Sequence, residues 1–270
     1  MNRFTLIALT LAAFTSPAFA AIKAETIEYQ AGDTKLKGFL VYDDAVKEKR
    51  PGILVMPEWW GLTEYPKSRA RQLAEMGYVA FAADMYGDGK TTEDPKEAGT
   101  WAGEVRGNVE LRRSRALAAL SVLRSRPEVE REKIGAIGFC FGGAIVLDMM
   151  RATMPVQGVV SFHGALGTET PAAKESNIAT HVLVLHGDAD PMVPPEEVAA
   201  FEKEMKDAAV QYELVKYPDA KHAFSNPDAD KYNLPPVAYQ KDAAEKSWGA
   251  MTDFFSQLFD KQTSTPTVNQ

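Results

Sequence analysis

Cys140 lies in the hexapeptide GFCFGG at residues 138–143, between an apolar run typical of a strand and another typical of a helix. A nucleophile held at a sharp turn between two elements needs neighbours without a Cβ, because only these let the strand and the helix approach closely. The G-x-C-x-G spacing is therefore typical of a nucleophile elbow with cysteine as the attacking residue. Cys140 is also the only cysteine in the sequence. The predicted chemistry is acyl transfer through a thioester.

A thiol becomes a good nucleophile near neutral pH when a base or a positive charge lies beside it. Of the four histidines, His222 alone lies between the last expected strand and the last expected helix. Asp188 and Asp190 both follow an earlier apolar run, and we favour Asp190 as the acid while Asp188 shapes the turn. The order nucleophile, acid, histidine is that of α/β-hydrolases. It predicts a Cys140-Asp190-His222 triad in which the acid fixes the tautomer of the imidazole.

Acyl transfer also needs hydrogen-bond donors for the oxyanion that develops on the substrate. The elbow supplies the N–H of Phe141, and the loop PEWWG at residues 57–61, after an early buried strand, supplies the N–H of Trp59. Glu58 is then near the thiol, where a carboxylate would hold Cys140 as a thiol or accept its proton. The alternative for Glu58 is a charge at the entry of the following helix.

A substrate pocket is expected around the thiol. Trp59 and Trp60 are large for a loop and are predicted to wall this pocket, with simple packing as the alternative. Tyr86 and His163 each follow a predicted strand and are assigned to the same pocket, although His163 could also be a packed residue. His186 is expected to pack at a strand end. The histidine spacing matches neither H-x-x-x-H nor H-E-x-x-H, so no metal is expected.

The elements that position these residues are expected to alternate between strand and helix. Two opening runs predict an antiparallel hairpin, and later continuous apolar runs predict buried parallel strands. The result is an α/β fold, a mostly parallel central sheet with helices on both faces, whose chemistry gathers at the carboxyl ends of the strands. The polar connection at residues 87–107 permits a short helix around Trp101. Strands are predicted at 26–30, 35–42, 52–56, 78–83, 133–137, 156–162, 181–185 and 210–217, and helices at 65–76, 109–124, 144–150, 195–208 and 237–259.

The first twenty residues are predicted to be a cleavable signal peptide. Arg3 gives a positive start, an apolar run follows, and the segment ends in an A-x-A site before Ala21. A signal anchor is the alternative, which the shortness of the apolar run disfavours. We therefore expect cleavage after Ala20 and a periplasmic or secreted protein, with one domain at residues 21–260 and a disordered tail at 261–270.

The charge balance restricts the partners. The net charge is −7, and it becomes −8 when Arg3 is removed with the signal peptide. This argues against nucleic acid or an anionic membrane surface as the main partner. The mature length suits one domain with a sizeable core, and we expect a monomer that binds a small molecule and needs no cofactor.

Five motifs, in the right order over nearly the whole mature chain, resemble the dienelactone hydrolase family. The resemblance implies an α/β-hydrolase fold and a Cys-His-Asp triad that acts on esters or lactones without a cofactor. Carried over by position, the triad is Cys140, Asp190 and His222, and Glu58 is the family's thiol-gating carboxylate. The motifs are Pro57-Glu58-x-x-Gly61, Ala83-Asp84-Met85-Tyr86, GFCFGG at 138–143, His186-Gly187-x-x-Asp190 and His222-Ala223-Phe224.

Two departures from the family bear on the substrate. Founding members have an arginine two residues after the tyrosine that corresponds to Tyr86, where this chain has Asp88. They have another arginine four residues after the histidine that corresponds to His222, where this chain has Asn226. In those enzymes the two arginines bind the substrate carboxylate. Their absence predicts a neutral or less anionic ester, thioester or lactone.

The function predicted from these residues is hydrolysis of a carboxylic ester or lactone through a cysteine acyl-enzyme. The alternative, from another class, is a non-catalytic ligand-binding or thiol-sensing protein on an α/β-hydrolase scaffold. Retention of His222 and Asp190 speaks against it, because a binding protein needs no triad. The residues do not separate a hydrolase from an acyltransferase.

Overall fold

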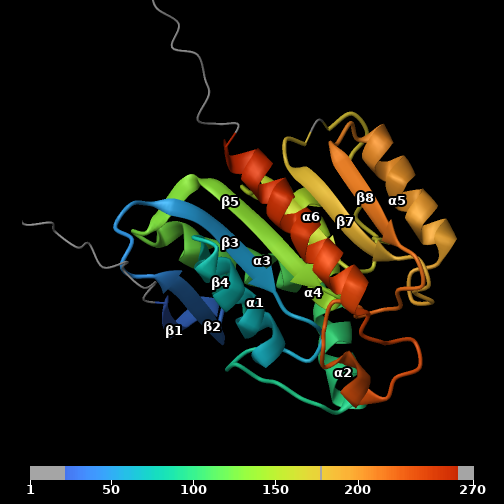
Figure 1. Cartoon of the computed structure of the whole chain (residues 1–270), viewed down its shortest axis with the longest axis horizontal. Helices are drawn as coiled ribbons and strands as arrows, with labels where there is room; N and C mark the ends of the chain where they lie inside the picture. Colours follow the sequence, from blue (N-terminus) through green and yellow to red (C-terminus); the bar gives the residue numbers. More distant parts are fainter. Residues whose placement is uncertain (1–21, 177, 261–270) are drawn as a thin grey trace, which may run out of the picture.

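The structure, a computed structural model, describes residues 22–176 and 178–260. The predicted signal peptide and the predicted tail at 261–270 lie outside the described residues. The described chain forms an eight-stranded sheet in the order β1-β2-β4-β3-β5-β6-β7-β8 (Figure 1). The strands are β1 (Ile22–Ala31), β2 (Thr34–Asp43), β3 (Arg50–Met56), β4 (Val79–Ala82), β5 (Val129–Phe139), β6 (Gly158–Phe162), β7 (His181–Gly187) and β8 (Tyr212–Tyr217).

The first two strands form the predicted antiparallel hairpin. Ala31 pairs with Thr34 across a two-residue turn, and Gly32 in this turn has a φ of 57°, a conformation that glycine adopts without strain. Strand β2 also pairs antiparallel with β4, whereas the strands from β4 to β8 are parallel to one another. The predicted α/β architecture with an antiparallel hairpin is thus confirmed.

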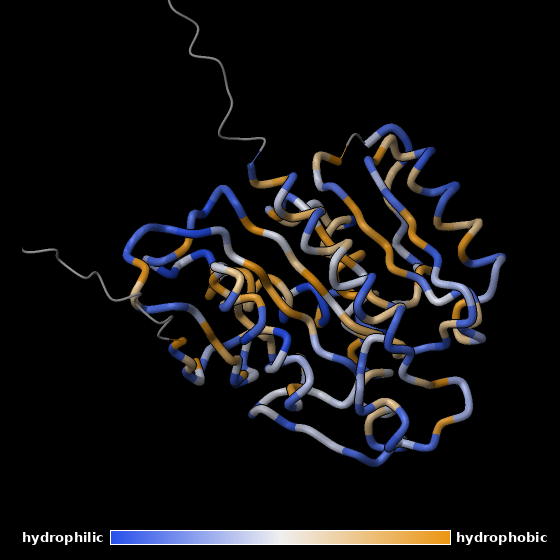
Figure 2. Tube along the Cα trace, viewed as in Figure 1, coloured by the Kyte–Doolittle hydropathy of each residue, from blue (hydrophilic) through white to orange (hydrophobic). Residues whose placement is uncertain are grey.

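Helices cover both faces of the sheet and enclose two apolar cores. Helices α1 (Glu64–Glu75) and α6 (Lys241–Asp260) pack on one face, where Leu73 and Phe255 are fully buried. Helices α3 (Val109–Ser125), α4 (Phe141–Arg151) and α5 (Pro195–Asp207) pack on the other. Among the described residues, the central strands are accordingly strongly hydrophobic, while the outer loops are hydrophilic (Figure 2).

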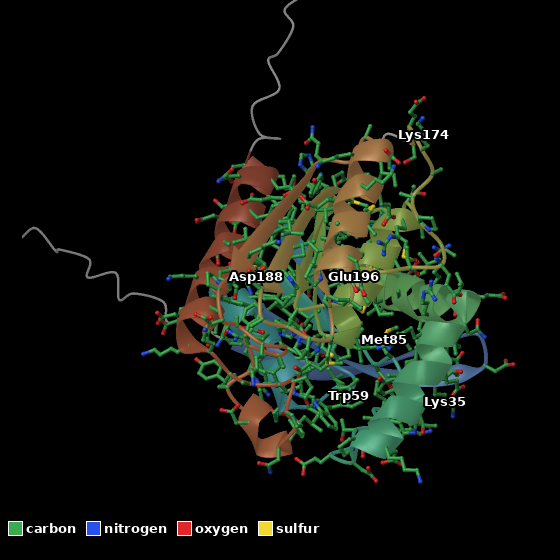
Figure 3. The ribbon with its side chains drawn as sticks, turned by 90° about the vertical axis from the view of Figure 1, so that its right-hand side faces the viewer. Lys35, Trp59, Met85, Lys174, Asp188 and Glu196 are labelled. Carbon is green, nitrogen blue, oxygen red and sulfur yellow. The ribbon has the colours of Figure 1, made fainter. Side chains whose placement is uncertain are left out.

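The sheet register sets neighbouring strand ends level with one another. Met56 at the end of β3 pairs with Gly138, Phe139 pairs with Phe162 at the end of β6, and Phe162 pairs with Leu185 in β7. The loops that leave these strands therefore meet at one edge of the sheet, as expected for chemistry in an open parallel sheet. Trp59, Met85 and Asp188 lie toward this end of the molecule, far from Lys174 (Figure 3).

Two connections differ from the expected boundaries. The segment expected to hold a short helix contains α2 (Pro95–Gly107), which begins with Asp94 as a cap that accepts from the N–H of Lys96 at 2.9 Å. The last helix begins at Lys241 and not at residue 237, because the backbone of residues 236–240 pairs with the loop of His222: the N–H groups of Ala238 and Gln240 donate to the carbonyl oxygens of His222 and Phe224 at 3.1 and 3.0 Å. A short 3₁₀ helix, η1 (Ala229–Tyr232), precedes this segment. In the described ranges, every helix is too short or too polar to cross a bilayer.

Candidate active site

Cys140 occupies a strained turn between β5 and α4. Its φ and ψ are 53° and −113°, a left-handed backbone region that non-glycine residues rarely adopt. The N–H of Cys140 is held by the carbonyl oxygen of Phe162 at 3.0 Å. The side chain remains partly exposed, whereas Phe139 and Phe141 on either side are buried. The thiol therefore points outward from a turn whose neighbouring side chains are buried.

The glycines around Cys140 permit this turn because backbone atoms occupy the space of their missing side chains. A Cβ on Gly138 would collide with the carbonyl oxygen of Gly142, and a Cβ on Gly142 would collide with that of Met56. The second contact also shows how closely the start of α4 approaches the end of β3. The elbow and the loop at residues 57–61 are therefore adjacent.

His222 lies in the loop after β8 and forms a buried pair with Asp190, which follows β7. The Nδ1 atom of His222 lies 2.7 Å from Oδ2 of Asp190. The other carboxylate oxygen of Asp190 accepts from the N–H of Met192 at 2.8 Å. Asp188, the competing acid, is exposed and lies 3.6 Å from the ammonium of Lys216. The structure therefore places Asp190, and not Asp188, against the imidazole.

The electrostatic surroundings favour the protonated form of His222. Burial alone would lower the pKa of the imidazole, but the charge of Cys140 and the hydrogen bond and charge of Asp190 raise this pKa to about 10. The Nε2 atom of His222 is buried and has no hydrogen-bond partner among the described residues. His222 and Cys140 line the same small cavity, so this nitrogen is free to exchange a proton within it.

Glu58 is buried in the same cavity. Its Oε2 atom accepts from the side-chain amide of Asn226 at 2.8 Å, and 2% of the residue is exposed. Burial raises the pKa of Glu58 to about 7, although the charge of His222 and the Asn226 hydrogen bond oppose this rise. Glu58 is therefore poised to hold or release a proton near neutral pH. Asn226 lies at the position where the founding enzymes have an arginine, and its side-chain amide donates to Glu58.

The two predicted oxyanion donors come from adjacent loops. Phe141 is the first residue of α4, so its N–H has no carbonyl acceptor within the helix. Trp59 follows β3 in a turn closed by a hydrogen bond from the N–H of Gly61 to the carbonyl oxygen of Glu58 at 3.2 Å. The role of both amides in binding an oxyanion stays a prediction.

Tyr86 holds the loop at residues 57–61 through a hydrogen bond. Its hydroxyl donates to the carbonyl oxygen of Trp59 at 3.0 Å, and burial raises the pKa of this phenol well above its ordinary value, which keeps the hydroxyl protonated. Asp84 in turn fixes the Tyr86 loop, because its carboxylate accepts from the N–H groups of Tyr86, Gly87 and Gly89 at 2.8 to 2.9 Å. Tyr86 was predicted to line the pocket, but it lies outside the cavity that Cys140 and His222 line and borders a separate cavity with Trp101. No sequence pattern indicated the structural role of Asp84.

The thiol lines one small cavity, and a larger cavity begins at the next residue, Phe141. The cavity that Cys140 and His222 share measures about 20 Å³, and Trp60 and Tyr232 also line it. The rings of these two residues stack with their centroids 4.0 Å apart. A larger cavity of about 560 Å³ runs from Phe141 along α4 to the end of α2. Charges of both signs border it, among them Arg106 and Glu169. Sequence reasoning missed Tyr232 and Arg106, since neither lies in a recognisable motif.

His163 is not where the sequence prediction placed it. The residue is 1% exposed and lies beneath the elbow, where its Nδ1 atom accepts from the N–H of Cys140 at 3.1 Å. It does not line the cavity around the thiol. The backbone of His163 has a φ of 40°, and its ring packs between those of Phe139 and Phe224. The pocket assignment of His163 is therefore wrong.

Asp88 also lies away from the site. Its carboxylate is 3.8 Å from the ammonium of Lys37, and it borders a separate depression with residues of β1 and β2. The aspartate therefore cannot repel an anionic substrate directly. Asn226 and the absence of an arginine at position 88 remain the features that favour a less anionic substrate.

The sequence model of the dienelactone hydrolase family matches residues 36–259, which include every residue of the site. The chain belongs to the dienelactone hydrolase family. Membership makes it a hydrolase of carboxylic esters or lactones and confirms the predicted family and enzyme class.

Relatives of this dienelactone hydrolase family member match most of its length. A dienelactone hydrolase-like promiscuous phosphotriesterase from metagenomic libraries is 36% identical, with 88% of this chain and 99% of that chain covered and a TM-score of 0.83. The solved structure m3DLH is 35% identical with the same coverage and a TM-score of 0.84. A protein of Bradyrhizobium named a probable 2-oxo-3-(5-oxofuran-2-ylidene)propanoate lactonase is 29% identical over 75% of this chain and 82% of its own length.

Proposed function

We propose that this protein hydrolyses a carboxylic ester or lactone through a thioester on Cys140. The observation that carries the proposal is the 2.7 Å contact between His222 and Asp190, which leaves the buried Nε2 of His222 free in the cavity that Cys140 lines. An imidazole oriented in this way by a carboxylate can serve a neighbouring nucleophile as both base and acid.

In the acylation step, the sulfur of Cys140 attacks the carbonyl carbon of the substrate. The electron pair of the carbonyl bond moves to oxygen, and the N–H groups of Phe141 and Trp59 stabilise the resulting oxyanion. When the tetrahedral intermediate collapses, the bond to the leaving oxygen breaks. The leaving oxygen takes the proton from Nε2 of the His222 imidazolium, and a neutral thioester remains.

In the deacylation step, His222 changes from acid to base. The charge of Cys140 is the largest influence that raises the pKa of His222, and this charge is absent from the thioester. The pKa of the imidazole therefore falls after acylation, so that Nε2 accepts a proton from water as the water oxygen attacks the thioester carbonyl. Cys140 leaves as a thiolate, and the imidazolium is restored.

For the substrate we propose a neutral or weakly anionic ester, thioester or lactone. Asn226, an uncharged amide bonded to Glu58, stands where an arginine would offer a positive charge. The larger cavity beside Phe141 is bordered by Arg106 and Glu169, so its charges are mixed. Its volume of about 560 Å³ lies within the range of small-molecule sites.

The test is intact mass spectrometry of the purified protein after brief mixing with p-nitrophenyl acetate, beside Cys140→Ser and His222→Ala. We expect a transient acetyl adduct on the wild type that is absent from His222→Ala. The adduct should map to Cys140 in a peptide digest. Nitrophenol release at the wild-type rate by a Cys140→Ala variant would rule out the thioester mechanism.

We propose further that the protein is exported and acts as a monomer. The A-x-A site before Ala21 supports export. Fractionation of the producing cell, with the mass of the mature protein, tests the location and the cleavage site after Ala20. Light scattering during size-exclusion chromatography tests the monomer.

A further inference from the structure

Four buried polar groups form a continuous chain beneath the nucleophile. It begins at the N–H of Cys140, which is shared between the carbonyl oxygen of Phe162 at 3.0 Å and Nδ1 of His163 at 3.1 Å. The Nε2 atom of His163 lies 2.7 Å from the hydroxyl of Ser225, which lies 2.8 Å from the hydroxyl of Tyr65. His163 and Ser225 are each 1% exposed. The chain joins four separate segments, namely the elbow, the end of β6, the loop that carries His222, and α1.

The direction of these hydrogen bonds fixes the tautomer of His163. A backbone N–H can only donate, so Nδ1 of His163 must be the acceptor and carry no proton. The proton of the neutral ring is therefore on Nε2, which donates to Ser225. Burial, together with the charge of His222, holds the pKa of His163 well below its ordinary value, so the ring stays neutral.

His163 also contacts the catalytic base. The rings of His163 and His222 meet edge to face with their centroids 5.4 Å apart. The ring of Phe224, two residues after His222, also meets the ring of His163 edge to face, with the centroids 5.2 Å apart. Because His163 is uncharged, it packs against the His222 imidazolium without a like-charge repulsion.

Ser225 connects the loop that carries His222 to His163, which in turn bonds the elbow at Cys140. It follows His222 by three residues, in a tight turn where Ala223 has a φ of 59° and accepts at its carbonyl oxygen from the N–H of Asn226 at 2.9 Å. The carbonyl oxygen of Ser225 accepts from the guanidinium of Arg69 at 2.8 Å. A shift of this loop would move His222 relative to Cys140, and the bond to His163 opposes such a shift.

We propose that His163 and Ser225 are positioning residues that hold Cys140 and His222 in register for acylation. The inference rests on the proposed function, because it assigns these residues to the thioester mechanism. His163 acts through its two ring nitrogens. Its Nδ1 atom accepts from the backbone N–H of Cys140, and its Nε2 atom donates to Ser225 in the loop that carries His222. Neither residue touches the substrate, since both are buried beneath the site.

Three substitutions of His163 separate its two hydrogen bonds, which are called the first arm, to the N–H of Cys140, and the second arm, to Ser225. His163→Asn retains an acceptor near the Nδ1 position for the N–H of Cys140, and His163→Gln retains a donor near the Nε2 position for Ser225. His163→Phe keeps the size of the ring and removes both arms. Ser225→Ala removes the second arm from the opposite side. Ser161→Ala is the matched control, because the Ser161 hydroxyl is equally buried in β6 but has no hydrogen-bond partner among the described side chains and backbone.

We expect His163→Phe to lower kcat at least about 10-fold with little change in KM, since misplaced reacting groups slow the chemical step. His163→Asn, His163→Gln and Ser225→Ala should show smaller losses, and Ser161→Ala none. The rate of Cys140 alkylation by iodoacetamide at pH 7 should fall in the same order. This second readout needs no ester hydrolysis, so it reports on the proposed positioning even if the proposed function fails.

Circular dichroism and thermal unfolding establish which variants are folded. If His163→Phe does not fold, the Asn, Gln and Ser225→Ala variants carry the test. The proposal is overturned if the folded variants keep the wild-type kcat and alkylation rate, or if KM rises while kcat is unchanged.

Discussion

The Nδ1 atom of His222 and Oδ2 of Asp190 lie 2.7 Å apart, with 6% and 0% of the two side chains exposed. The two residues come from loops after different strands, β8 and β7, which run parallel side by side. A charge-assisted hydrogen bond in such a buried place is strong and restricts the imidazole to one orientation. The pair leaves Nε2 as the nitrogen that exchanges protons.

Asp190→Asn should lower kcat for ester hydrolysis by about 10³-fold or more, since an amide cannot stabilise the imidazolium or fix its tautomer. Asp188→Asn provides the control. It removes a neighbouring carboxylate that pairs with Lys216 at the surface, so kcat should change less than 2-fold, or about 0.4 kcal/mol of barrier. Steady-state kinetics of both variants decide the matter, and equal losses would contradict the assignment of Asp190.

Glu58→Gln should make the protein more stable at pH 8 than the wild type. Burial raises the pKa of Glu58 from 4.5 to about 7. Between these pH values the folded protein keeps a proton that the unfolded chain has lost, so the free energy of unfolding falls as pH rises through this window. The loss between pH 5 and pH 8 is about 2 kcal/mol for such a shift.

Urea unfolding at pH 5 and pH 8 measures the effect. The stability gained by Glu58→Gln should be larger at pH 8 than at pH 5 by about 2 kcal/mol. Glu97→Gln, which removes an exposed carboxylate on α2, controls for the change in net charge. A gain that is the same at both pH values would show that Glu58 does not titrate in this window.

Tyr86→Phe should lower kcat about 5-fold to 10-fold without loss of folding. The substitution removes the 3.0 Å hydrogen bond to the carbonyl oxygen of Trp59, so the amide of Trp59 is less rigidly placed for the oxyanion. Tyr78→Phe is a suitable control, because Tyr78 lies at the far end of the sheet against Phe259. Comparison of kcat and KM for both variants tests the prediction, and an unchanged kcat for Tyr86→Phe refutes it.

Gly142→Ala should prevent native folding, whereas Gly249→Ala should stabilise the protein. A Cβ at Gly142 would overlap the carbonyl oxygen of Met56, a backbone atom that cannot move aside. Gly249 is exposed in the middle of α6 and has no atom within 4 Å of the added methyl group. Alanine there should add about 1 kcal/mol of stability. Soluble yield and urea unfolding measure the two effects, and a native-like Gly142→Ala would contradict the close approach of α4 to β3.

Several features of the fold follow from local sequence alone. The continuous apolar runs at β3, β4 and β7 are typical of buried strands in an α/β sheet, and the glycines beside Cys140 indicate a sharp turn. The start of α6 and the length of α2 were less predictable. Helix ends depend on caps and prolines whose effect competes with tertiary packing.

The roles of several polar residues were not predictable in the same way. His163 follows a strand like a pocket residue, and Asp88 follows the tyrosine where an arginine is expected, yet the first is buried under the elbow and the second pairs with Lys37. Nothing within a few residues of either position specifies these outcomes. Each depends on which strand or loop lies alongside.

The sequence by itself determined the chemical groups of this protein, namely a lone thiol on an elbow, a late histidine and an acid after an apolar strand. These follow from residue type and from short-range steric limits on the backbone. The tertiary structure alone decided which groups touch. Asp190 rather than Asp188 faces His222, Asn226 bonds Glu58, and His163 links Cys140 to Ser225. Such contacts join residues 23 to 168 positions apart, and they exist only once strand register has brought the loops to one edge of the sheet.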